Sequence, residues 1–468
     1  MAQFNVNGGK SLKDYPGELL EQWDQEYIWH PFTQMQEYVK DKPLVIERGE
    51  GSYLTDIEGK RYLDGVSSLW VTVHGHNKKE LNSAIAEQLD KIAHSTLLGL
   101  ANVPAILLAK KLVEITPPGL NKVFYSDSGS TAVEIALKMA FQYWQQKDGG
   151  AFSKKIRYIS MGEAYHGDTI GSVSVGGMEM FHDIFRPLLF ECVHVPAPYC
   201  YRCPLGLAKP SCGMACAQAV EEVMSKSHCG IAAMIIEPLV QGAAGMIVAP
   251  EGYLRKIREL CSRYNILLIA DEVAVGFGRT GKMFACRHED VNPDLMCLAK
   301  GITGGYLPLA ATLATDEVYQ AFLGSHSERK TFFHGHTYTG NPLACAAALA
   351  NIKLIESEKI IDGLNEKVSF LEQGLKRFSG LAHVGDIRQK GLMAGIELVQ
   401  NKDTKEPYPW EDNIGHKVIL EARKNGLVIR PLGNIIVLMP VLSMSIPELG
   451  RLLDITYHAI VKITGEAD

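Results

Sequence analysis

Short apolar runs that end in polar residues recur through the middle of the chain. The clearest run spans Ile266 to Ala270 and stops at Asp271 and Glu272. A run that is apolar at every position is typical of a strand buried on both faces of a parallel sheet. Further strands are predicted at 122–125, 156–161, 232–236, 295–299 and 309–314.

Helical patterns separate these strands. Apolar residues recur at steps of three and four after the turn at 126–131, and again in the segment before Ile266. Such steps predict amphipathic helices, and Asn341 followed by Pro342 is a typical start for another helix. Strands that alternate with helices predict a parallel, doubly wound sheet.

The two ends of the chain have a different pattern. Residues 44–70 contain short runs broken by glycine, which predict a small antiparallel meander. We therefore predict an α/β protein in which a large domain is combined with a smaller α+β domain. Residues 1–75 form an N-terminal arm and part of the small domain, 76–340 form the large domain, and 341–468 supply a linking helix and the C-terminal part of the small domain.

Composition argues against several classes of partner. The 468 residues include 47 basic and 53 acidic side chains, and a net charge of −6 gives no basic surface for nucleic acid or an acidic membrane. The N-terminal segment lacks the apolar centre of a signal peptide, and no run reaches the ~18 apolar residues of a membrane span. We expect a cytoplasmic protein that binds neither nucleic acid nor membrane.

Two groups of residues have spacings that could suit a metal. Four of the ten cysteines cluster in the sequence: Cys200, Cys203, Cys212 and Cys216. The first pair has zinc-ligand spacing, but the second pair and the eight residues between the pairs fit zinc motifs only loosely. Reduced cysteines in a surface insertion are therefore predicted, with a structural metal as the alternative. His74 and His76 are predicted to lie in a strand-end turn, because no acid or cysteine is spaced to complete a metal site.

The candidate chemistry lies at the ends of two predicted strands. Asp271 follows one strand, and Lys300 follows the next and leads into a glycine-bearing turn. Ligands of open parallel sheets bind beyond the carboxyl ends of the strands, so the acid and the amine should face one pocket. Pyridoxal phosphate needs both groups: an amine that binds its aldehyde as a Schiff base, and an acid at its pyridine nitrogen. An ion pair at the sheet edge is the structural alternative.

Other residues suit the rest of this cofactor. Gly129 and Ser130 lie where a strand leads through a turn into a helix, and could bind a phosphate, although a plain helix cap uses the same residues. Tyr165 follows another strand and could stack on the pyridine ring or be a core tyrosine. Thr337, in a turn before a helix, is a second candidate for the phosphate. Arg430 could clamp a carboxylate with two hydrogen bonds or be a surface charge.

Two long motifs carry a family resemblance. DEVAVGFGRTG at 271–281 and PDLMCLAKGITGGYLPLAA at 293–311 resemble the class III (subgroup II) aminotransferases, which are fold type I pyridoxal phosphate enzymes. The resemblance implies a homodimer with active sites at the subunit interface. The cofactor-binding residues that it implies are Gly129, Ser130, Tyr165, Glu237, Asp271 and Lys300, with His336 and Thr337 from the other subunit.

A narrower resemblance concerns the reaction. WHPFTQM, LDGVSSLWVTVHGH, HGHTYTGNPLACA and IRPLGN are similar to motifs of the 7,8-diaminopelargonic acid synthases of biotin biosynthesis. This implies amination of 8-amino-7-oxononanoate to 7,8-diaminononanoate, with Lys300, Asp271 and Tyr165 as catalytic residues. The substrate-binding residues that it implies are Phe32, Leu69, Trp70, Tyr165, Lys300, Gly335 and Arg430.

Some positions depart from the usual motifs. Phe32 and Leu69 stand where synthases that use S-adenosylmethionine typically have tyrosine and tryptophan, so L-lysine is the predicted donor and S-adenosylmethionine the alternative. Val275 replaces a usual threonine, and the PYCYRCPLG insertion resembles ω-amino acid and diamine aminotransferases, which are the alternative function, with a keto-acid acceptor. A transcription regulator built on this fold would need a DNA-binding arm, for which the ~30 residues before WHPFTQM are too few and too acidic.

Overall fold

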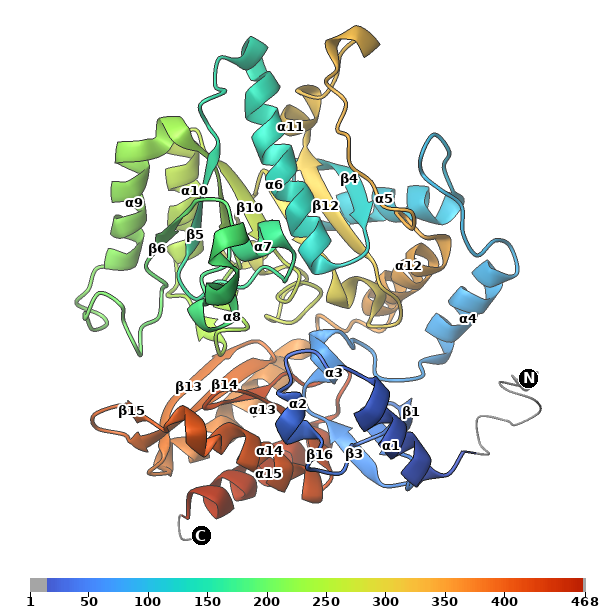
Figure 1. The fold of residues 1–468 in the computed structure, drawn as a ribbon, viewed down its shortest axis with the longest axis vertical. Coiled ribbons are helices and arrows are strands. Elements are labelled where there is room, and N and C mark those ends of the chain that lie inside the picture. Colours follow the sequence, from blue (N-terminus) through green and yellow to red (C-terminus); the bar gives the residue numbers. More distant parts are fainter. Residues whose placement is uncertain (1–14, 466–468) are drawn as a thin grey trace.

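The computed structural model describes residues 15–465. Figure 1 shows two regions: a large sheet with its helices, and a smaller region that contains both described ends of the chain. The large sheet has seven strands in the order β4-β12-β11-β10-β7-β5-β6. These strands are β4 (Leu120–Ser126), β5 (Arg157–Met161), β6 (Cys192–Val195), β7 (Ile231–Ile236), β10 (Leu267–Asp271), β11 (Leu295–Leu298) and β12 (Ala310–Thr315).

The large sheet is mostly parallel, as predicted. Strand β12 pairs antiparallel with both of its neighbours, and the remaining pairs are parallel. Each strand predicted for this sheet is present within one or two residues of its expected ends. Strand β6, at the edge of the sheet, was not predicted. Because β10 and β11 are parallel neighbours, with Asp271 opposite Cys297, their carboxyl ends lie side by side.

Helices cover both faces of this sheet. Alternate residues of β10 point to different apolar clusters: Ile269 packs with helix α6, and Leu268 packs with helix α10. Asn341 caps the helix that was predicted to begin at Pro342. The helices of this region are α4 (Lys79–Leu89), α5 (Val103–Ile115), α6 (Gly129–Gln146), α7 (Ile170–Ser174), α8 (Glu179–His182), α9 (Ala215–Ser227), α10 (Tyr253–Arg263), α11 (Asp316–Gln320) and α12 (Pro342–Ser357).

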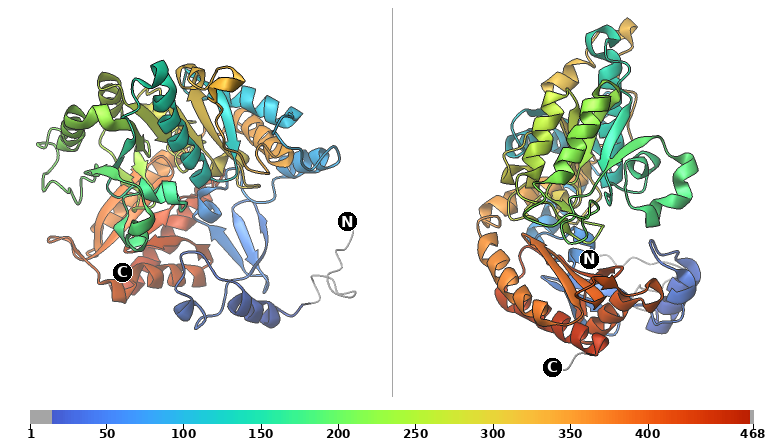
Figure 2. Two further views of the ribbon diagram at one scale, coloured as in Figure 1. Left: turned by 45° about the horizontal axis from the view of Figure 1, so that its top comes forward. Right: turned by 90° about the vertical axis from the view of Figure 1, so that its left-hand side faces the viewer.

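The smaller region combines segments from both ends of the chain (Figure 2). The predicted meander is confirmed as β1 (Ile46–Glu50), β2 (Tyr53–Asp56) and β3 (Arg61–Asp64). Strand β16 (Leu427–Val428) pairs parallel with β3 and so joins the two ends. The second sheet contains β13 (Val384–Lys390), β14 (Met393–Asn401), β18 (Ile435–Leu438) and β17 (Arg430–Leu432), with β15 (Glu406–Pro407) beside β14.

Helices before, between and after these strands complete the smaller region (Figure 1). They are α1 (Gly17–Tyr27), α2 (Met35–Tyr38), α3 (Ser67–Trp70), α13 (Leu364–Leu375), α14 (Ile414–Lys424) and α15 (Ile446–Thr464), and a small ribbon is formed by β8 (Val240–Gln241) and β9 (Ile247–Val248). None of the helices within residues 15–465 is both long and apolar enough to cross a membrane. The domain limits given above stay predictions, and residues 1–14 of the first segment lie outside the described part of the chain.

Candidate active site

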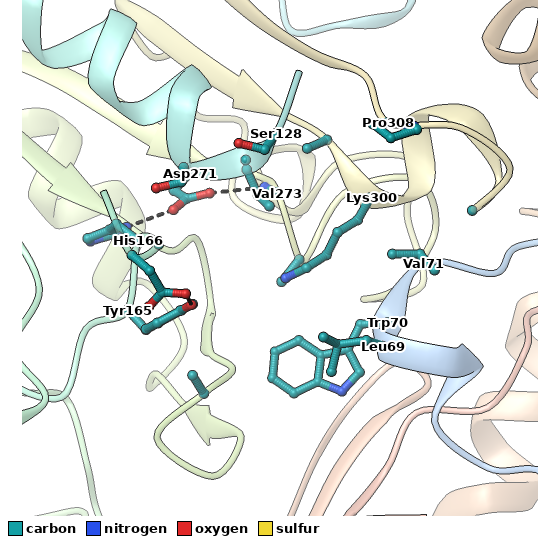
Figure 3. A pocket seen from close by; sticks show the side chains of 18 of the residues that line it. Leu69, Trp70, Val71, Ser128, Tyr165, His166, Asp271, Val273, Lys300 and Pro308 are labelled. Carbon is teal, nitrogen blue, oxygen red and sulfur yellow. Dashed lines mark hydrogen bonds and ion pairs between the residues drawn. The ribbon is translucent and has the colours of Figure 1, made fainter. Parts of the chain in front are cut away.

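Asp271 is the last residue of β10 and is almost fully buried. One carboxylate oxygen accepts a hydrogen bond from the amide of Val273 at 3.0 Å, and the other lies 2.7 Å from Nδ1 of His166 (Figure 3). Burial of an acid is costly unless its oxygens are bonded, and these two contacts supply that support. The pair fixes the direction of the carboxylate at the strand end.

His166 is a site residue that the sequence reasoning missed. It follows β5, and β7 lies between β5 and β10 in the sheet, so only the strand order brings it to Asp271. Its other ring nitrogen, Nε2, is buried and has no hydrogen-bond partner among residues 15–465. The available signal was its position directly after Tyr165 at a strand end that already held a candidate.

Lys300 enters the same space from the end of β11. Its backbone has a φ of 47°, a left-handed value that is uncommon outside glycine. Figure 3 shows its amine pointing toward the space between Asp271 and Trp70, and Nζ lies 4.9 Å from the centre of the Trp70 ring. Burial lowers the pKa of the Lys300 amine, against the opposing effect of Asp271. A lowered pKa favours the neutral amine, which is the form that attacks a carbonyl or takes a proton.

The start of helix α6 supplies amide donors beside this pair. Ser128 caps the helix in a capping box with Thr131, so Gly129 and Ser130 are its first two residues, and amides at this position have no acceptor within the helix. A Cβ at Gly129 would lie 2.5 Å from Cγ1 of Val273. Only glycine therefore allows the helix start to approach the end of β10 so closely. The hydroxyl of Ser130 bonds to Thr169 Oγ1 at 2.8 Å.

Tyr165 and Glu237 are joined through the main chain. Glu237 is buried, and its two oxygens accept from the amides of Tyr165 at 3.1 Å and Gly242 at 2.9 Å. Burial raises the pKa of Glu237 to about 7. The phenol of Tyr165 donates to Asp168 at 2.7 Å. Glu237 thus supports the backbone from which the Tyr165 ring projects.

These residues surround one cavity of about 740 Å³. The predicted site residues that line it are Phe32, Leu69, Trp70, Gly129, Ser130, Tyr165, Glu237, Asp271, Lys300 and Arg430. Arg430 is half-buried, and within residues 15–465 no carboxylate lies within ion-pair distance of it. Burial lowers the pKa of its guanidinium. An unpaired guanidinium in a cavity is suited to a carboxylate ligand.

The wall of the cavity includes an aromatic residue that was not predicted. Phe181, from α8, packs edge-on against Phe32 at a centroid distance of 5.5 Å and against Tyr165 at 6.5 Å. Phe32 is itself left-handed, with a φ of 52°. The N-terminal arm and α8 therefore meet at the cavity.

Gly335, His336 and Thr337 do not line the cavity of their own chain. Nδ1 of His336 instead lies 2.6 Å from a carboxylate oxygen of Asp127, just before the start of α6. Phe333, in the same loop, is 79% exposed. The contribution of these loop residues to a second subunit stays a prediction.

The possible metal ligands occupy other places. Within residues 15–465 no three histidine, cysteine or acidic side chains form a group that could hold a metal ion, and the cysteines are free thiols. Nε2 of His74 lies 3.3 Å from the carbonyl of Asn351, and Nε2 of His76 lies 2.9 Å from Asp64.

The site fits pyridoxal phosphate on the chemistry of its donors. The start of α6, with no side chain at Gly129, offers amides to a phosphate. Asp271 offers an acid held in place by His166, and Lys300 offers an amine whose pKa is lowered. All three features converge on the same cavity.

The fold and this site are those of an aminotransferase. Residues 35–460 match the family Aminotransferase class-III, and the chain belongs to that family. It is 56% identical over 456 residues to the adenosylmethionine-8-amino-7-oxononanoate aminotransferase of Geobacter sulfurreducens, covering 97% of this chain and 100% of the relative.

Solved structures agree with this assignment. The crystal structure of adenosylmethionine-8-amino-7-oxononanoate aminotransferase from Methanocaldococcus jannaschii has a TM-score of 0.91 and 49% identity, covering 96% of this chain and 99% of that chain. An (S)-enantioselective ω-transaminase from Thermomicrobium roseum also has a TM-score of 0.91, at 36% identity, with coverage of 96% and 99%.

Proposed function

We propose that this aminotransferase converts 8-amino-7-oxononanoate to 7,8-diaminononanoate in biotin biosynthesis, using pyridoxal 5'-phosphate. The observation that carries the proposal is the Arg430 guanidinium, which has no carboxylate partner within residues 15–465, in the cavity that also holds Lys300 and Asp271. A keto acid with a distant carboxylate could place its carbonyl at the amine and its carboxylate at the guanidinium. The similarity to adenosylmethionine-8-amino-7-oxononanoate aminotransferases supports the same acceptor.

Each residue has a role that follows from its position. Pyridoxal phosphate supplies an aldehyde and an electron-withdrawing ring when it is bound. Asp271 would hold a proton on the ring nitrogen, and His166 would keep its carboxylate in line. Lys300 would hold the cofactor's aldehyde, and its amine would move a proton at the substrate carbon as a general base and acid. Tyr165 would cover one face of the ring, and Gly129 and Ser130 would bind the phosphate.

A second copy of the chain completes the proposed site. Phe333 and Tyr338 are strongly exposed on either side of Gly335–Thr337. Apolar residues gathered on a loop suggest a protein contact, and we propose a homodimer in which this loop reaches the partner's cofactor. The free thiols suit a reducing compartment, and we place the enzyme in the cytoplasm.

Two residues of the cavity wall bear on which amino donor the enzyme uses. Phe32 and Leu69 both line the cavity, and neither supplies the hydroxyl or the indole that would face an adenosyl or sulfonium group. We therefore propose L-lysine as the donor. The relatives' names specify adenosylmethionine, so each donor must be tested directly.

The acceptor is tested by comparing two keto acids. Purified protein with the cofactor should show a far higher kcat/KM for 8-amino-7-oxononanoate than for pyruvate. The half-reaction without acceptor, followed by the loss of cofactor absorbance, then compares L-lysine with S-adenosylmethionine. Preference for pyruvate, with an ω-amino acid or diamine as donor, would instead favour the function suggested by the PYCYRCPLG insertion and by the ω-transaminase neighbour.

A further inference from the structure

The turn that presents Leu69 and Trp70 to the cavity has an unusual backbone. Ser67, Ser68 and Trp70 have φ values of 52°, 60° and 66°. Residues other than glycine rarely adopt this left-handed conformation, and it persists where the surroundings hold it in place. Because none of these residues is a glycine, the surrounding structure must hold the turn in this conformation.

Asp64 supplies that support from the end of β3. It is fully buried, and its two oxygens lie 3.0 and 2.8 Å from the amide of Ser68. It also accepts from the amide of Val66 at 3.3 Å. On the far side of the turn, the Ser67 hydroxyl donates to the carbonyl of Met439 at 2.7 Å. The turn is thus tied at both sides by buried hydrogen bonds.

His76 fixes the position of Asp64. Its Nε2 lies 2.9 Å from Asp64 Oδ2. Its main chain makes two hydrogen bonds with Gly51, at 3.1 and 2.7 Å. A Cβ at Gly49 would lie 2.7 Å from the Cβ of His76, so the neighbouring strand packs directly on this side chain. The imidazole is fixed independently of the turn that it supports.

The supported turn reaches the reacting groups. Trp70 is 6% exposed and its ring lies 4.9 Å from the Lys300 amine, whereas Leu69 is 48% exposed and lines the cavity (Figure 3). We propose that Asp64 and His76 are positioning residues, which hold this strained turn so that Trp70 and Leu69 shape the substrate side of the cavity. Neither residue lines the cavity itself.

The same motif contains a matched control. His74 is a buried histidine two residues before His76, and its Nε2 lies 3.3 Å from the carbonyl of Asn351, away from Asp64. A general loss of packing around the HGH sequence should follow from changing either histidine. Loss of the support for the turn should follow only from changing His76 or Asp64.

The test uses the holoenzyme with His76→Ala, His76→Gln and His74→Gln. We expect His76→Ala to raise the KM for 8-amino-7-oxononanoate about tenfold with little change in kcat, because the cavity wall moves while Lys300 keeps its support. His76→Gln, which can still donate to Asp64, should recover most of this loss. His74→Gln should lower Tm without changing KM. If both histidine variants raise KM in proportion to their loss in Tm, the positioning role is refuted.

A second measurement does not depend on turnover. The KM comparison rests on the proposed function, because it uses the proposed acceptor. Acrylamide quenching of the Trp70 fluorescence, obtained as the difference from Trp70→Phe, measures directly how well the turn shields the Trp70 ring. Quenching should increase in His76→Ala and remain low in His74→Gln. Should His76→Ala fail to fold, Asp64→Asn takes its place in the same comparison. Unchanged quenching in a folded variant would overturn the inference, even if the wild type turned over a different keto acid.

Discussion

Gly129→Ala is the substitution whose effect is best defined by the structure. The added Cβ would lie 2.5 Å from Cγ1 and 3.1 Å from Cγ2 of Val273, so one element must move by about 0.9 Å to restore ordinary contact. The main chain of Val273 is tied to the acid, because its amide donates to Asp271 at 3.0 Å. The substitution should therefore displace the phosphate-binding turn, the acid, or both.

The expected magnitude is a loss of ~10–100-fold in cofactor affinity, since displacements near 1 Å at a site cost about that much. The free energy of unfolding should change less, because the higher helix propensity of alanine offsets part of the cost of the clash. Titration of cofactor-free protein with pyridoxal phosphate, followed by absorbance, measures the affinity, and thermal unfolding measures the stability.

Two further variants make this prediction specific. Gly129→Ala combined with Val273→Ala should recover most of the affinity, because the clash is with the Val273 side chain. Gly380→Ala is a control, since no atom of residues 15–465 lies within 4 Å of its added Cβ. Normal affinity in Gly129→Ala, or no recovery in the double variant, would refute the assignment of this turn as the phosphate site.

Three other changes have defined outcomes. Asp271→Asn should lower kcat by several powers of ten, at ~1.4 kcal/mol for each tenfold, and weaken cofactor binding less; near-normal turnover in stopped-flow assays would exclude the assigned role. Arg430→Ala should raise the KM for 8-amino-7-oxononanoate strongly and spare the amine half-reaction; an unchanged KM would indicate a different carboxylate clamp. Because burial raises the pKa of Glu237 to about 7, folded protein keeps this proton to higher pH than the unfolded chain does. The free energy of unfolding should then fall from about pH 5 to 7, and urea unfolding of Glu237→Gln should show a smaller fall.

The strand ends could be predicted from the sequence because each one is marked by residues that are adjacent in the chain. The apolar run before Asp271 and the run before Lys300 define two buried strands, and the rule that ligands bind beyond the carboxyl ends places both side chains together. The phosphate-binding role proposed for Gly129 was predicted in the same way, from a strand that leads through a turn into a helix. These predictions needed only the order of elements and no knowledge of distances.

Other features depend on tertiary contacts that leave little local signal. His166 reaches Asp271 because the sheet order places β5 two strands from β10. Asp64 and His76 gain their role only when the strained turn at Ser67–Trp70 forms. Spacing alone could say that the HGH sequence was an unlikely metal site, and it could not identify the carboxylate that one of its histidines contacts.

The most direct test of the account is transfer of the amino nitrogen itself. Purified protein would be incubated with pyridoxal phosphate, 8-amino-7-oxononanoate and donor labelled with ¹⁵N at its amino groups, and the product analysed by mass spectrometry. The account predicts 7,8-diaminononanoate carrying one ¹⁵N atom with the wild type, and none with Lys300→Ala. Absence of labelled 7,8-diaminononanoate with both L-lysine and S-adenosylmethionine, from protein that aminates pyruvate, would contradict it.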